Sequence, residues 1–212
     1  MTRALLHLLF LLSLARPGPA ATLRITLQDE KGKPVEDVVV SLVRADGPMP
    51  AVQPMSAVEI IQKDQQFGPY VTAVTVGTPV TFPNKDTVQH HVYSLSKPKK
   101  FEFPLYMPGK AETIVFDQPG IVTIGCNIHD WMLAYLVVLP TPWFAKTDAR
   151  GVAVAAAPPG KFRLEVWHPR LGTPVSLDVT LSDTEPQPIQ LPLSLKPDRR
   201  VRRLTEGKPG GY

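Results

Sequence analysis

The sequence predicts an all-β protein built from Greek-key β-sandwiches. Proline is the first reason, because 24 of the 212 residues are proline, roughly double the average usage. These prolines are scattered between β-branched runs rather than gathered into repeats. After the first 20 residues, no segment of convincing length repeats its apolar residues with the period of a helix. Instead, short apolar runs alternate with turns that contain Gly, Pro and Asn. Strands are therefore favoured over helices.

The first 20 residues have the composition of a secretory signal peptide. A basic start at Arg3 precedes an apolar run from Ala4 to Ala15, and the small residues Gly18 and Ala20 follow. This run is shorter than the roughly 20 residues that a membrane-spanning helix needs. We therefore expect cleavage after Ala20, export to the periplasm, and a mature protein without a membrane span.

Residues 21–46 are expected to form a hairpin. Leu23, Ile25 and Leu27 alternate with polar residues, a turn at 29–32 follows, and residues 38–43 are apolar. An isolated two-stranded unit is marginal in water, so this hairpin needs a partner sheet.

Residues 141–195 provide a candidate partner. They contain turns at 148–151 and 158–160, with strand-like runs at 162–167 and 175–181. We expect them to complete one small sandwich with the hairpin. Residues 51–140 would then be inserted between the two parts; in the alternative, the hairpin strands join the central sandwich directly.

Residues 51–140 predict the central Greek-key sandwich. Short β-branched and aromatic runs, separated by turn residues, occur at 71–76, 80–82, 88–95, 113–116, 121–124 and 133–139. Residues 196–212 are rich in basic residues, Pro and Gly, and we expect a flexible, solvated tail. The net charge of +4 lies largely in the leader and this tail. No nucleic-acid partner is expected.

The single cysteine, Cys126, marks the candidate site. It lies in the run Gly-Cys-Asn-Ile-His-Asp-Trp-Met together with His129 and Met132, in a short loop between two predicted strands. His90 or His91, on another strand, can come alongside. A thiolate, two imidazoles and a weak thioether form the soft site that holds copper for electron transfer. Zinc is the competing metal, and the methionine favours copper.

Two stretches of this region resemble the cupredoxin family of type 1 blue copper proteins. The first is Phe82-Pro83-Asn84-Lys85-Asp86 with His90 six residues after Asn84, and the second is Phe116-Asp117-Gln118-Pro119-Gly120 with Cys126 six residues after Gly120. The spacing Cys-x-x-His-x-x-Met is similar to that of amicyanin, whereas the plastocyanin loop is longer. The resemblance implies a cupredoxin sandwich, one type 1 copper ion, and His90, Cys126, His129 and Met132 as its ligands.

The chain departs from the family at His91, where the family usually has Asn. This leaves open whether His91 binds the metal or hydrogen-bonds across to the Cys126 loop. Strand alternation places His90 and His91 on opposite faces, so both cannot point at one metal. By the same resemblance, Asn84 is expected to lie next to the metal ligands and to support them by hydrogen bonds without binding the metal itself. Asp130 and Trp131 replace prolines of the amicyanin loop and are expected to contact a partner protein or, for Trp131, to pack locally.

The flanking segments resemble a different family. The turn sequences at 29–37, 147–151 and 158–162 are similar to those of the transthyretin-like, immunoglobulin-like sandwich of carboxypeptidase regulatory domains. The whole layout also resembles exported bacterial proteins labelled methylamine utilization proteins, which implies an electron-transfer setting.

Three functions are compatible with these residues. The leading one is a monomeric periplasmic carrier of single electrons, with a transient redox partner such as a cytochrome c or a dehydrogenase. The alternative is a module that stores or delivers copper, although the chain has no Met-rich or His-rich tract. A copper enzyme is disfavoured, because the expected mature chain has only two histidines outside the candidate site, too few for the additional copper sites of related oxidases and nitrite reductases.

Overall fold

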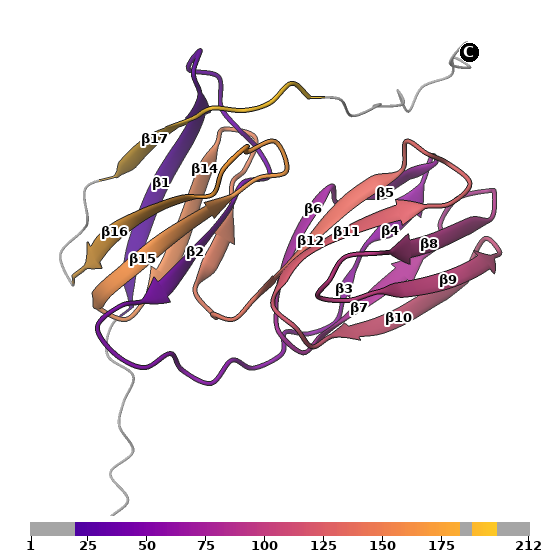
Figure 1. Cartoon of the computed structure of the whole chain (residues 1–212), viewed down its shortest axis with the longest axis horizontal. Helices are drawn as coiled ribbons and strands as arrows, with labels where there is room; N and C mark the ends of the chain where they lie inside the picture. The colour runs from indigo at the N-terminus through magenta and orange to yellow at the C-terminus, as the bar shows by residue number, and fades with distance from the viewer. Residues whose placement is uncertain (1–19, 183–187, 199–212) are drawn as a thin grey trace, which may run out of the picture.

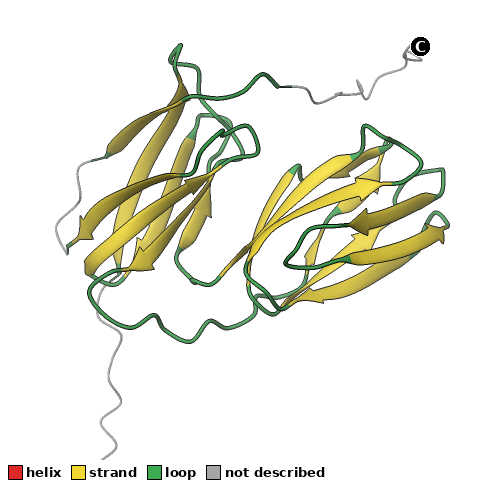
Figure 2. Cartoon of the chain, in the orientation of Figure 1, coloured by secondary structure: helices red, strands yellow, loops and turns green. Residues whose placement is uncertain are grey.

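The computed structural model describes residues 20–182 and 188–198, and every regular element in this part of the chain is a strand (Figure 2). The predicted all-β fold class is confirmed. Apart from Ala20, the expected signal peptide lies outside the described residues, as does residue 199 onward of the expected tail. Within the described ranges no helix is long and apolar enough to span a membrane.

The first two and last five strands pack as one small sandwich (Figure 1). Its facing sheets have the orders β14-β1-β17 and β13-β2-β15-β16. Leu23, Ile25 and Leu27 alternate with less buried residues and share a core with Phe162 and Leu164. The strands are β1 (Ala21–Asp29), β2 (Val39–Arg44), β13 (Phe144–Lys146), β14 (Val152–Ala157), β15 (Gly160–Trp167), β16 (Val175–Leu181) and β17 (Ile189–Leu193).

The N-terminal segment is not a hairpin of paired strands, which corrects the prediction for residues 21–46. β1 pairs with β14 and β17, whereas β2 pairs with β13 and β15 in the opposite sheet. After the turn at Asp29 the chain returns beside the end of β1 only as far as Val35, whose N–H donates to the Leu27 carbonyl at 3.0 Å. β2 is buried on both sides, with Val40 in the small core and Val39 in a second apolar cluster.

The central strands form a larger sandwich with sheet orders β10-β7-β3 and β6-β12-β11-β8-β9 and a separate β4-β5 hairpin. Phe82, Phe116, Ile124 and Leu136 are fully buried in its core. The pairings β12–β6 and β3–β7 are parallel, so they need crossover connections. The strands are β3 (Val58–Glu59), β4 (Ile61–Lys63), β5 (Gln66–Gly68), β6 (Val71–Thr75), β7 (Thr78–Pro83), β8 (His90–Ser94), β9 (Phe101–Tyr106), β10 (Ala111–Phe116), β11 (Gly120–Cys126) and β12 (Leu133–Leu139).

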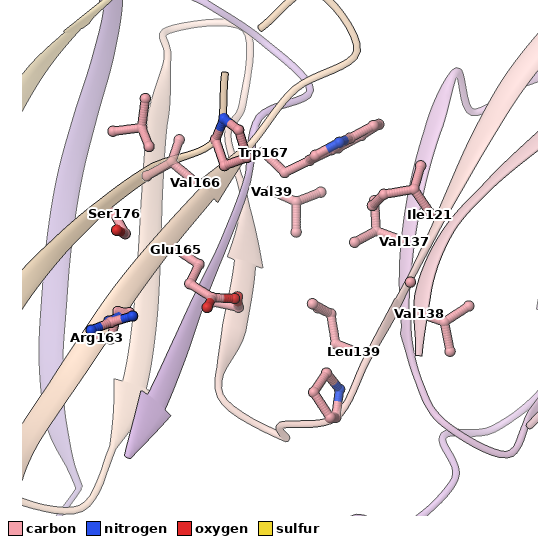
Figure 3. Close-up of a pocket in the computed structure, with 15 residues that line it drawn as sticks. Val39, Ile121, Val137, Val138, Leu139, Arg163, Glu165, Val166, Trp167 and Ser176 are labelled. Carbon is pink, nitrogen blue, oxygen red and sulfur yellow. The ribbon is translucent and has the colours of Figure 1, made fainter. Parts of the chain in front are cut away.

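The two sandwiches meet through an apolar cluster. Val39 packs there with Val137, and the rings of Tyr135 and Trp167 meet edge to face with centroids 5.7 Å apart. A cleft of about 330 Å³ lies beside this contact; Figure 3 shows Val39, Val137 and Trp167 around it together with Ile121. The 126–132 loop joins the ends of β11 and β12 that point away from this contact. It therefore lies far from the small sandwich (Figure 1).

Candidate metal centre

Strand β8 directs His90 into the core of the larger sandwich. His90, Val92 and Ser94 are buried, whereas His91 and Tyr93 are partly exposed, as the alternation of side chains along a strand requires. β8 pairs antiparallel with β11, and Val92 lies opposite Cys126. His90 lies two residues from Val92 on the same face, and this places its imidazole beside the cysteine.

The loop after β11 returns His129 to the same point. Asn127 N–H donates to the His91 carbonyl at 3.0 Å, which ties the start of the loop to β8. Met132 N–H donates to the His129 carbonyl at 2.9 Å and closes a tight turn. The loop therefore folds back over the end of β11, with His129 beside Cys126.

Three donor atoms converge at this position. The Cys126 Sγ atom lies 3.7 Å from Nδ1 of His90 and 3.6 Å from Nδ1 of His129. One donor atom from each residue lies within 4.8 Å of the others. A metal ion bound by sulfur at about 2.3 Å and nitrogen at about 2.0 Å holds these ligands roughly 3.5–3.8 Å apart. The observed separations fit ligands of one ion.

The electrostatics of the site favour an anionic sulfur. Burial opposes ionisation of Cys126, but hydrogen bonding to His90 and to the backbone of His91 and Ile128 holds the pKa of the thiol below its usual value. Burial also tends to lower the pKa of His90, but hydrogen bonds to Cys126 and Asp86 raise it above its usual value. The thiolate is the form of cysteine that binds metals.

Asp86 supports His90 from behind, and sequence reasoning did not identify this role. Its Oδ2 atom lies 3.1 Å from His90 Nε2, and the side chain is only 8% exposed. Burial opposes ionisation, but the backbone N–H groups of Gln65 and Thr87 and the contact with His90 hold the pKa of Asp86 below its usual value. The spacing of four residues between Asp86 and His90 was visible in the sequence, but it does not by itself identify a contact.

Asn84 organises the loop that carries Asp86. Its buried amide donates to the Val88 carbonyl at 2.9 Å and to the Tyr106 carbonyl at 3.2 Å, and its Oδ1 accepts from Asp86 N–H at 3.0 Å. These bonds fix the connection between β7 and β8. Asn84 thus contacts Asp86, which in turn contacts His90.

His91 faces away from the three converging atoms. Its Nε2 atom lies 2.9 Å from the Glu102 carboxylate on the neighbouring strand β9. Its backbone carbonyl accepts the bond from Asn127 described above. His91 thus contacts the cysteine loop through its backbone, while His90 supplies the imidazole beside Cys126.

The last three residues of the loop occupy different environments. Trp131 is half-buried, packs its ring against His129 at a centroid distance of 5.3 Å, and donates from Nε1 to the Gln65 carbonyl at 3.0 Å. Met132 is 2% exposed and belongs to the same core cluster as Cys126. Asp130 is exposed to solvent.

Known proteins are similar to only part of this chain. No protein-family model matches the chain, and no curated protein sequence matches it. A purple cupredoxin from Nitrosopumilus maritimus aligns at 26% identity and a TM-score of 0.36, covering 39% of this chain and 99% of that one.

Two further solved structures align with part of the chain. A copper-containing nitrite reductase from Thermus scotoductus aligns at 26% identity and a TM-score of 0.38, covering 46% of this chain. This chain spans only 25% of that enzyme. A mutant of amicyanin in its reduced state aligns at 20% identity and a TM-score of 0.36, covering 43% of this chain and 97% of that one.

Proposed function

We propose that this chain is an exported carrier of single electrons that holds one copper ion at His90, Cys126, His129 and Met132. The observation that carries the proposal is the convergence of Cys126 Sγ with Nδ1 of both histidines. Copper bound there would supply the reversible exchange of one electron between Cu(I) and Cu(II). The resemblance of the whole layout to proteins labelled methylamine utilization proteins supports such an electron-transfer setting.

The set of donors favours copper over zinc. Structural zinc sites commonly use four Cys or His ligands. Here three such residues converge, and the nearby buried side chain is the thioether of Met132. A trigonal Cys-His-His set with a weak axial methionine is the arrangement associated with copper electron transfer.

The protein holds these ligands on rigid supports. His90 is fully buried on β8, and Cys126 is the last residue of β11. Little ligand movement is then needed when the charge of the site changes. His129 is only half-buried, so its ring edge is the proposed route for the electron.

The partner is proposed to be another redox protein, such as a cytochrome c or a dehydrogenase. Ile128, beside His129, is 47% exposed, and Asp130 is also exposed. Together with the outer edge of Trp131 they would form a small contact surface around His129. Weak redox encounters use interfaces of this limited size. We further propose that the carrier is a periplasmic monomer.

Voltammetry of the copper-loaded chain tests the proposal. A carrier gives a fast, reversible one-electron couple, and excess zinc does not displace the copper. A protein that stores or delivers copper instead binds Cu(I) tightly, has no stable Cu(II) form, and transfers the metal to a chelator. That second outcome, or preferential binding of zinc, would overturn the electron-carrier proposal.

A further inference from the structure

The turn of the β4-β5 hairpin contacts one neighbour of each candidate histidine. Asp64 and Gln65 form this turn with φ of 54° at each residue. The Gln65 N–H donates to Asp86 Oδ2 at 2.6 Å, and the Gln65 carbonyl accepts from Trp131 Nε1 at 3.0 Å. The backbone of one residue therefore contacts the two side chains that support the two imidazoles.

The first support acts on His90. The Oδ2 atom of Asp86 receives both the Gln65 N–H and the contact from His90 Nε2 at 3.1 Å. An ionised carboxylate can only accept hydrogen bonds, so it keeps a proton on Nε2. Nδ1 is thereby directed toward Cys126 as the coordinating atom. A carboxylate behind a metal-bound imidazole also makes that imidazole a stronger donor.

The second support acts on His129. The Trp131 ring packs against the imidazole, and its N–H is anchored on the Gln65 carbonyl. An indole held at both its face and its N–H cannot turn without breaking one of these contacts. The His129 ring is therefore confined between the indole and the ring of His90, whose centroid lies 5.0 Å away.

We propose that Gln65, through its backbone, joins Asp86 and Trp131 into one clamp that fixes both imidazoles toward Cys126. We call these three residues the hairpin clamp. Asp86 and Trp131 are positioning residues. The clamp rests on the proposed function only for the identity of the metal, because its contacts are formed by the protein alone. The negative charge of the Asp86 carboxylate also favours Cu(II) over Cu(I) at the site.

The test uses the full chain with Asp86→Asn, Trp131→Phe and the double variant. Asp86→Asn removes the charge at nearly constant shape, and Trp131→Phe keeps a ring but removes the N–H. Two matched controls make the same changes elsewhere: Asp117→Asn at an exposed ion pair with Lys99, and Trp143→Phe in the small sandwich.

Affinities for Cu(II) and, separately, for Zn(II) alone give the first readout. Loss of an outer partner of a metal-bound histidine lowers affinity by about 10–100-fold, so we expect about a tenfold loss for each clamp variant. The two controls should stay at the wild-type affinity. Because both side chains act through Gln65, the double variant should lose less than the product of the single losses.

The reduction potential gives the second readout, which a merely structural residue would not move in a set direction. If Asp86→Asn weakens Cu(II) binding about tenfold more than Cu(I) binding, the potential rises by about 59 mV. Asp117→Asn should leave it unchanged. Should Asp86→Asn fail to fold, Trp131→Phe and its control still test the other support.

The outcomes separate this proposal from the proposed function. A reversible wild-type couple combined with unchanged affinities in the clamp variants, or with strictly multiplicative losses, overturns the clamp and leaves the carrier intact. A wild type without a copper couple, in which the same variants still weaken zinc binding in a non-additive way, supports the clamp and overturns the carrier.

Discussion

The Sγ atom of Cys126 lies 3.7 Å from Nδ1 of His90, although 36 positions separate the two residues in the chain. The antiparallel pairing of Cys126 with Val92 produces this contact, because His90 and Val92 share one face of β8. The sheet thus positions two of the three converging donor atoms, and the loop closed at Met132 positions the third.

Alanine substitution of the two adjacent histidines tests which one serves the site. His90→Ala should abolish the coloured copper form, because it removes the buried imidazole beside Cys126. His91→Ala should retain it, because that side chain pairs with Glu102 instead. Optical titration with Cu(II) measures both variants. Loss of colour in His91→Ala with retention in His90→Ala would reverse the ligand assignment.

Met132→Leu tests the proposed weak thioether ligand. Leucine has a similar volume, so the free energy of unfolding of the metal-free protein should change by less than about 1.5 kcal/mol. The copper form should stay coloured, and its reduction potential should rise because a sulfur donor to Cu(II) is lost. Differential unfolding and voltammetry give the two values. An unchanged potential would indicate that Met132 is only a core residue.

Asp148 links stability to pH at a turn of the small sandwich. Hydrogen bonds from the backbone N–H of Val152 and from the Arg150 side chain hold the pKa of Asp148 below its usual value. A lowered pKa in the folded state stabilises the protein above the unfolded-state pKa of about 3.9, and this contribution is lost as the pH falls through the lowered value.

Comparison of wild type with Asp148→Asn in urea measures this contribution. The variant should be less stable at neutral pH, and the difference should shrink below about pH 4. A difference in unfolding free energy that stays constant down to the acid limit would show that the charge of Asp148 contributes nothing.

Trp167→Ala tests the contact between the two sandwiches. The indole packs edge to face on Tyr135 and is half-buried, so the loss should be smaller than the roughly 3–5 kcal/mol of a fully buried tryptophan. The copper spectrum should not change, since the site lies at the far end of β11 and β12. Thermal unfolding and the optical spectrum check both points. A changed spectrum would mean that the two sandwiches are coupled.

Much of the fold was predictable because its strands carry strong local patterns. β12 and β16 have the predicted bounds, and the apolar face of β1 was read correctly from its alternation. The pairing partners of β1 and β2 were not predictable. A turn after Asp29 looks the same whether the following strand returns beside β1 or crosses to the opposite sheet, and tertiary packing decides between them.

The candidate site was predictable as far as its residue types and spacing, and the structure brings His90, Cys126 and His129 together. The contact of Asp86 with His90 and the part played by Gln65 were not predicted. The β4-β5 hairpin is only three residues long on each side and turns at Asp64 and Gln65 without a glycine, so it lacks the usual sequence signal. Its contacts with Asp86 and Trp131 connect distant parts of the chain and arise only from the tertiary fold.

The most direct test of the copper proposal is the optical and paramagnetic-resonance spectrum of the Cu(II)-titrated wild type beside that of Cys126→Ala. We predict one equivalent of copper, an intense blue or purple charge-transfer band with narrow copper hyperfine splitting, and loss of this band in the variant. A pale wild type whose spectrum matches that of Cys126→Ala would contradict the proposal, because the thiolate would then not be bound to the metal.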